Sequence, residues 1–249
     1  MSGHSKWSTI KRKKSATDSK RGKAFTKTIK ELTTASRAGG GNPAGNPRLK
    51  LAIASAKACN MPNDTIDRAI KRGTGELEGI SYEEILYEGY GPAGVAILLE
   101  SLTDNRNRTV SEIRSIFTKY GGHLGESGSV SWMFEKKGYI SFKKENLDPD
   151  KVMEVALNAG AEDVKEDEDS MDIITDQVHF EEVKKKVDAS GLKYNVAEVA
   201  MVPKTTVKLG REDAEKVLRL MEALEDCDDV QNVYSNFDIP QAVLNEIGT

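Results

Sequence analysis

The residues best suited to chemistry in this sequence are the cations near its beginning. Between Met1 and Ala38 the chain carries eleven basic and two acidic residues, a net charge of +9 on a protein whose formal net charge is −4. Such a density of like charge repels itself unless an anion lies against it, and the commonest large polyanion in a cell is nucleic acid. The eleven residues are Lys6, Lys11, Arg12, Lys13, Lys14, Lys20, Arg21, Lys23, Lys27, Lys30 and Arg37.

These cations divide between an arm and a helix. Residues 1–19 lack apolar periodicity and predict a flexible basic arm. Between residues 19 and 37 the pattern is helical, with apolar residues on one face and a ridge of cations on the other, formed by Lys20, Lys23, Lys27 and Lys30. A charged ridge is often only a solvated surface. Trp7 within the cluster favours nucleic acid, because an indole ring stacks on an unpaired base, but it could instead pack the arm onto the helices.

Two further arginines stand where a local rule disfavours them. Arg106 and Arg108 fall in the first turn of a predicted helix, where the positive end of the helix dipole repels cations. Together with the free backbone N–H groups of that turn they would suit a phosphate. The alternative is an internal ion pair with Glu100 or Glu112.

No combination of residues predicts catalysis. The stretch Gly89–Gly94 matches G-x-G-x-x-G, but a strand and not a helix follows it, so we expect a hairpin turn instead of a dinucleotide site. The three histidines, His4, His123 and His179, have no metal-ligand spacing. The acidic run at residues 162–169 lacks the alternation of a calcium loop. We therefore predict no enzyme activity, no cofactor and no metal.

Bulk properties place the chain among globular proteins of the cytoplasm. Residues 1–80 carry a net charge of +11 and residues 81–249 a net charge of −15, so the front is basic and the rear acidic. Two distant cysteines, Cys59 and Cys227, make no disulfide framework, which suits a reducing compartment. The sequence contains neither an apolar run of about 20 residues that would span a membrane nor a secretory signal.

The periodicity predicts how these residues are positioned. Residues 20–80 read as a basic three-helix domain, with Asn46 capping a helix that Pro47 begins and a stop at Gly73. Residues 135–205 read as β-α-β-β-α-β, the ferredoxin-like pattern. Strands and helices on either side of this unit predict that it is inserted in a discontinuous α/β domain, residues 81–134 plus 206–249. The fold class is thus α+β, a helical domain followed by two ferredoxin-like domains.

Several motifs resemble the YebC/PmpR family of regulatory proteins. They run through the whole chain and are densest over residues 3–134: Gly3-His4-Ser5-Lys6-Trp7, Lys20-Arg21-Gly22-Lys23-Ala24-Phe25-Thr26-Lys27, Asn46-Pro47-Arg48-Leu49, Asn60-Met61-Pro62, Tyr87-Glu88-Gly89-Tyr90-Gly91-Pro92, Asp104-Asn105-Arg106-Asn107-Arg108-Thr109 and Gly128-Ser129-Val130. The resemblance implies three domains and no enzyme activity. It implies a cytoplasmic DNA-binding transcriptional regulator or, alternatively, a ribosome-associated translation factor that relieves stalling at proline runs.

Charge and resemblance together predict a nucleic-acid interface. The physical argument indicates a binder of polyanions, either DNA or ribosomal RNA, and does not choose between them. The expected contacts are His4, Ser5, Lys6, Trp7, Lys11, Arg12, Lys13, Lys14, Lys20, Arg21, Lys23, Lys27, Lys30, Arg37, Arg48, Lys50, Arg106 and Arg108.

Overall fold

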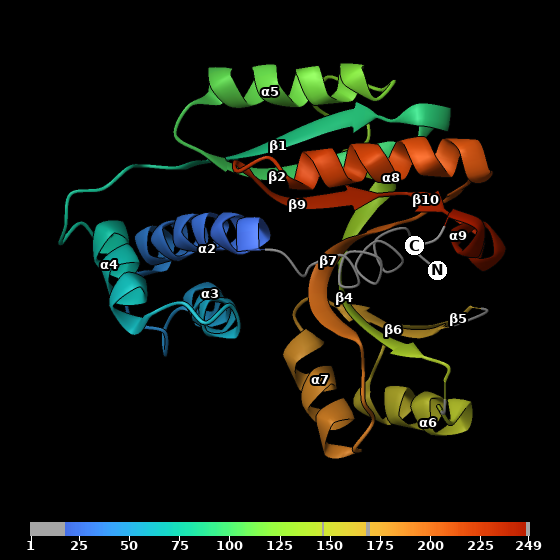
Figure 1. Cartoon of the computed structure of the whole chain (residues 1–249). Coiled ribbons are helices and arrows are strands. Elements are labelled where there is room, and N and C mark those ends of the chain that lie inside the picture. Colours follow the sequence, from blue (N-terminus) through green and yellow to red (C-terminus); the bar gives the residue numbers. More distant parts are fainter. Residues whose placement is uncertain (1–17, 146, 168–169, 248–249) are drawn as a thin grey trace.

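The computed structural model describes residues 18–145, 147–167 and 170–247, with side chains from residue 22 onward. Over these residues the chain forms three helices followed by two antiparallel sheets, each covered by helices (Figure 1). This is the expected α+β class, with a helical N-terminal region and antiparallel sheets. Among the described residues, no helix combines the length and the apolar character that a membrane span requires.

The helical domain is built by α2 (Asp18–Gly39), α3 (Pro47–Ala58) and α4 (Asn63–Thr74). Asn46 caps α3 as expected, since its Oδ1 accepts the N–H of Leu49 at 3.1 Å while its Nδ2 donates to the carbonyl of Ala35. The apolar core gathers Leu32, Ala35, Leu49, Ala52, Ala56, Met61, Ile66 and Ala69. Every member of this cluster comes from the three helices or the turn between α3 and α4, so the helical domain has a core of its own.

Gly73 does not end α4, contrary to expectation. The helix continues to Thr74, and Gly75, with a φ of 85°, occupies the left-handed position after it. Gly73 is instead buried at the crossing of α4 and α2, where an added Cβ would collide with the carbonyl of Thr33. A glycine here lets two helix backbones approach each other closely.

The first sheet has the strand order β3-β1-β2-β9. Its strands are β1 (Glu83–Tyr90), β2 (Ala96–Thr103), β3 (His123–Leu124) and β9 (Val230–Ser235), and α5 (Arg106–Lys119) and α8 (Arg211–Glu225) cover one face (Figure 1). The glycine-rich stretch turns β1 directly into antiparallel β2, which confirms the hairpin. This hairpin joins the two inner strands of the sheet. Along the chain, the elements of this sheet follow the order β-β-α-β before the second sheet and α-β after it.

The second sheet has the order β5-β6-β4-β7 and the predicted β-α-β-β-α-β sequence. It comprises β4 (Phe134–Lys143), α6 (Pro149–Ala159), β5 (Asp163–Glu166), β6 (Ser170–Asp176), α7 (Phe180–Ala189) and β7 (Val196–Pro203). The core between sheet and helices includes Ile140, Phe142, Val152, Ile173 and Val183. The two sheets meet through a separate apolar cluster that contains Leu98, Tyr234, Phe134 and Ala200.

The chain closes with short elements. These are β8 (Val207–Lys208), which pairs in parallel with β10 (Phe237–Asp238), and α9 (Gln241–Ile247). The pattern of residues 193–207 predicts one long strand, but the structure divides this stretch into two strands, β7 and β8. The last helix was not predicted from the sequence.

One expected strand is absent. Residues 130–134 read as a strand, but Ser131–Met133 form a short 3-10 turn, η2, and β4 begins only at Phe134. The cause is the buried carboxylate of Glu88, which accepts the N–H groups of Gly128, Val130 and Ser131 at 2.7–2.8 Å. These N–H groups are consequently not available to a strand partner.

Candidate nucleic-acid interface

Three lysines of the ridge on α2 contact the end of α8. Each donates from Nζ to a backbone carbonyl there: Lys23 to Asp226 at 3.0 Å, Lys27 to Glu225 at 2.5 Å and Lys30 to Asp228 at 2.9 Å. The last carbonyls of a helix lack intrahelical partners and carry the negative end of its dipole, which explains why Glu225 and Asp226 attract Lys27 and Lys23. Asp228, the acceptor for Lys30, lies in the turn after α8. The expected outward orientation is therefore corrected for these three residues, and in Figure 1 the turn between α8 and β9 lies next to α2.

Asp229 is the centre of this contact. Its Oδ1 lies 2.5 Å from Lys30 Nζ, and both side chains are buried, with 4% and 8% of their surface exposed. Its other oxygen accepts the Thr109 hydroxyl at 2.6 Å and Arg108 Nη2 at 2.9 Å. Burial favours the neutral acid, but the hydrogen bonds from Lys30, Thr109 and Arg108 outweigh it and lower the pKa of Asp229 to about 2.

Arg108 is thereby committed to an internal pair. Its guanidinium contacts Asp104 at 2.7 Å as well as Asp229, so neither partner weighed from the sequence, Glu100 or Glu112, is the one observed. Asn105 caps α5 by accepting the N–H of Arg108. Arg106 is exposed and makes no ion pair with the described residues.

Arg48 also has internal partners. It forms a two-pronged pair with Glu31 at 2.6 and 3.0 Å and reaches Glu84 of β1 at 2.7 Å, which joins α2, α3 and the first sheet. Lys50 is exposed, and Arg37 is exposed but hydrogen-bonded to Ser81. The remaining predicted contacts, from His4 to Lys14, lie outside the described residues, as do the side chains of Lys20 and Arg21.

Exposed cations that were not among the predicted contacts lie on α4. Arg68, Lys71 and Arg72 occupy positions i, i+3 and i+4, opposite the buried Ile66 and Ala69. This spacing brings their side chains onto one outer strip of the helix. Lys57 on α3 is exposed as well, while Asp64 and Asp67 on α4 reduce the net charge. The spacing of these cations is present in the sequence, but the density of cations is higher over residues 1–38.

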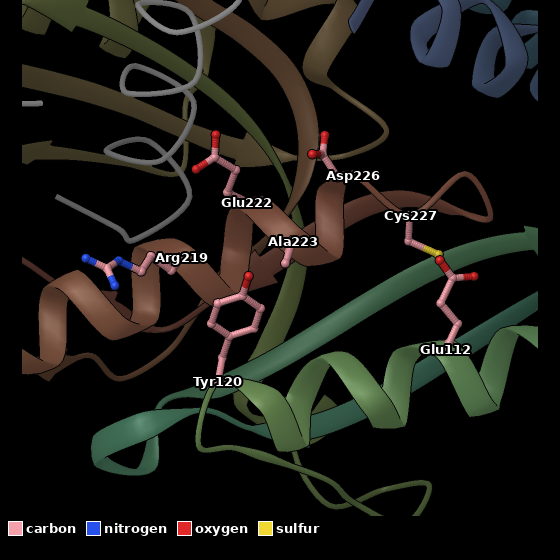
Figure 2. Close-up of a pocket in the computed structure, with 7 residues that line it drawn as sticks. All are labelled: Glu112, Tyr120, Arg219, Glu222, Ala223, Asp226 and Cys227. Atoms are coloured by element: carbon pink, nitrogen blue, oxygen red, sulfur yellow. The ribbon is translucent and has the colours of Figure 1, made fainter. Parts of the chain in front are cut away.

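A hollow near the lysine contact does not suit an anion. It measures about 380 Å³ and lies between α5 and α8 (Figure 2). Glu112, Glu222 and Asp226 line it with a single cation, Arg219, and Figure 2 shows Cys227 and Glu112 pointing toward each other. Burial raises the pKa of the Cys227 thiol to about 11, so it is not a reactive thiolate at neutral pH. Within the described ranges no group of three His, Cys, Asp or Glu residues could hold a metal ion.

The fold and the lysine contact define a class of three-part proteins. Three helices contact, through lysines, a first sheet with its helices, and residues 134–203 form a second sheet with its own helices between β3 and β8. Residues 5–76 match the model of the TACO1/YebC protein N-terminal domain, and residues 82–237 match that of the TACO1/YebC second and third domain. The chain therefore belongs to the TACO1/YebC family.

Curated relatives resemble the chain over nearly its full length. A probable transcriptional regulatory protein of Desulforapulum autotrophicum is 60% identical over 98% of this chain and 99% of its own. One of Geobacter sulfurreducens is 59% identical over 99% and 100%. The crystal structure of a conserved hypothetical protein from Aquifex aeolicus superposes with a TM-score of 0.78 at 48% identity, covering 90% of this chain and 92% of that one.

Proposed function

We propose that this protein is a non-enzymatic regulator of gene expression that binds nucleic acid through its basic front. The contacts would come from the arm, from Lys20 and Arg21 at the start of α2, and from the outward cations Arg37, Lys50, Arg68, Lys71 and Arg72, with Arg106 extending the track. The relatives' names, probable transcriptional regulatory protein, support a role in transcription.

The observation that carries the proposal is the separation of charge. The first 80 residues hold a net charge of +11 although the rest of the chain is strongly acidic. Internal pairs account for Lys23, Lys27, Lys30, Arg48 and Arg108 but leave the strip on α4 directed outward. Phosphate contacts of this kind fix position and orientation rather than sequence.

The second candidate is a translation factor that contacts ribosomal RNA. The exposed strip on α4 consists of charges, without the Asn and Gln side chains that pair with adenine in the major groove. Recognition by backbone and shape is typical of RNA helices. Cosedimentation with ribosomes, lost on deletion of residues 1–19, would favour this candidate, whereas a clear sequence preference on duplex DNA without cosedimentation would favour transcription.

The test is a salt titration of binding to labelled duplex DNA and single-stranded RNA, read by fluorescence anisotropy. Two triple variants remove the proposed contacts: Lys11→Ala/Lys13→Ala/Lys14→Ala in the arm and Arg68→Ala/Lys71→Ala/Arg72→Ala on α4. Each lost phosphate contact should reduce the slope of log affinity against log salt by about 0.9 on duplex DNA and about 0.7 on single strands.

A matched control removes three exposed lysines from the inserted domain, Lys151→Ala/Lys185→Ala/Lys193→Ala. The control changes the net charge equally, so its slope should stay at the wild-type value. Unchanged affinity and slope in both the arm and the α4 variants would refute the proposed function.

A further inference from the structure

We propose that Lys23, Lys27 and Lys30 form a second nucleic-acid contact surface that the end of α8 covers in this conformation. The carbonyls and carboxylates of residues 225–229 and a phosphate backbone would then compete for the same ammonium groups. The inference rests on the proposed function and adds its regulation: the α8 end acts as an internal inhibitor that nucleic acid displaces.

The chemistry of the covering segment supports competition. Four of its five residues are acidic, Glu225, Asp226, Asp228 and Asp229, and three of its carbonyl oxygens accept lysine protons. A lysine ammonium binds phosphate oxygens as a point charge in the same way. The lysines span seven residues of helix, or about 10 Å at a rise of 1.5 Å per residue. One strand of duplex DNA presents about three phosphates over that length.

The architecture allows the helical domain to separate. Its apolar core contains only residues 25–70, so detachment from the α/β domain opens no part of that cluster. The described contacts between α2 and the end of α8 are polar, and the Lys23–Asp226 pair is 41% and 51% exposed. A single connection, residues 75–82, joins α4 to β1, and its residues 75–81 are all exposed (Figure 1).

Further polar contacts would have to open. Arg48 reaches Glu84, Arg37 is hydrogen-bonded to Ser81, and the Lys30 ammonium lies 5.7 Å from the centre of the Tyr82 ring. The Arg48–Glu84 side chains are 38% and 55% exposed, and an ion pair with that exposure contributes little to stability. The buried Lys30–Asp229 pair is thus the main barrier to separation.

The test uses variants on both sides of the contact, with opposite expected signs. Asp226→Asn/Asp228→Asn changes two exposed residues of the covering segment and should tighten binding of a labelled single-stranded RNA 20-mer by about three- to tenfold, the range of two partly exposed charge interactions. Lys23→Gln/Lys27→Gln should weaken binding and lower the salt slope. Glu154→Gln/Glu181→Gln, two exposed acids of the inserted domain, removes the same charge and should leave affinity within about twofold of wild type.

Amide hydrogen exchange is a second measurement, and a general effect of net charge on binding would not change its result. Saturation of the wild-type protein with the same RNA should speed exchange of residues 226–230, because the segment loses its lysine partners. Slower or unchanged exchange there, or equal gains in the Asp226/Asp228 and Glu154/Glu181 variants, would overturn the inference. The proposed function fails separately, through unchanged binding of the arm and α4 variants.

Discussion

Replacement of Asp229 by alanine tests the contact that joins α2, β2, α5 and β9. The carboxylate accepts from Lys30, Arg108 and Thr109, and its backbone carbonyl accepts the N–H of Leu102. Asp229→Ala keeps the backbone bond but removes the carboxylate partner of the buried Lys30 ammonium, which retains the Asp228 carbonyl and the Tyr82 ring, 5.7 Å from Nζ. We expect a large loss of stability, because an uncompensated charge stays inside the protein.

Two routes give the magnitude. Removal of one partner from a buried ion pair costs about 3–5 kcal/mol. The pKa of Asp229, about 2 against an ordinary 3.8, corresponds to a preference for the ionised folded state of roughly 2 kcal/mol at 1.36 kcal/mol per pH unit. The mutation costs more than protonation, because protonation leaves an oxygen that still accepts hydrogen bonds from Lys30 or Arg108.

The sign of the pH dependence follows from the same shift. A lowered folded-state pKa means that the contribution of Asp229 is complete above the unfolded-state pKa of about 4 and is lost as the pH falls toward 2. Wild-type stability should therefore decline over this interval by more than that of Asp229→Ala.

Urea unfolding followed by circular dichroism gives the overall stability, and hydrogen exchange at the amides of Leu102 and Val230 gives the local stability of β2 and β9. The matched control is Asp226→Ala, whose side chain is half exposed in its pair with Lys23 and should cost less than about 1 kcal/mol. Equal, small losses of stability in Asp229→Ala and Asp226→Ala would refute the reasoning that Asp229 is a buried, tightly paired charge.

Two predictions concern other buried positions. Glu88→Gln should lower the free energy of unfolding by about 1.5–3 kcal/mol, because it weakens the charge-assisted hydrogen bonds from the loop before η2. The variant should also change the fluorescence emission of Trp132, measured in a Trp7→Phe background. Burial alone would raise the pKa of Glu88, but those N–H bonds lower it below the ordinary glutamate value. The contribution of the Glu88 carboxylate to stability should therefore be complete at neutral pH and be lost as the pH falls through this lowered pKa. A difference in stability between wild type and Glu88→Gln that did not depend on pH would contradict this. Gly73→Ala should destabilise the helical domain by about 1–3 kcal/mol, because the added methyl group would overpack against Thr33. The comparison is Gly75→Ala at an exposed position, where the positive φ causes strain but the methyl group meets no neighbouring atom. Unchanged thermal unfolding of Gly73→Ala would exclude a close crossing of α4 and α2.

The sequence predicted the elements better than their partners. Asn46 and Pro47 predicted the start of α3, because capping is a local interaction. The pattern of strands and helices over residues 135–205 predicted the full β-α-β-β-α-β order. The strand expected over residues 130–134 failed because the competitor for its N–H groups, Glu88, lies some forty residues earlier. No local pattern reports a bond over that separation.

The candidate site shows the same division. Helical periodicity placed Lys23, Lys27 and Lys30 on one ridge, and the structure keeps them together. The sequence alone determined the charge, its separation between front and rear, and the amphipathic helices that arrange it, because these depend on composition and on spacing of three or four residues. Only the tertiary structure decided what the ridge faces, since its partners follow about 200 residues later and reach it only when β9 pairs with β2 and brings the end of α8 to α2.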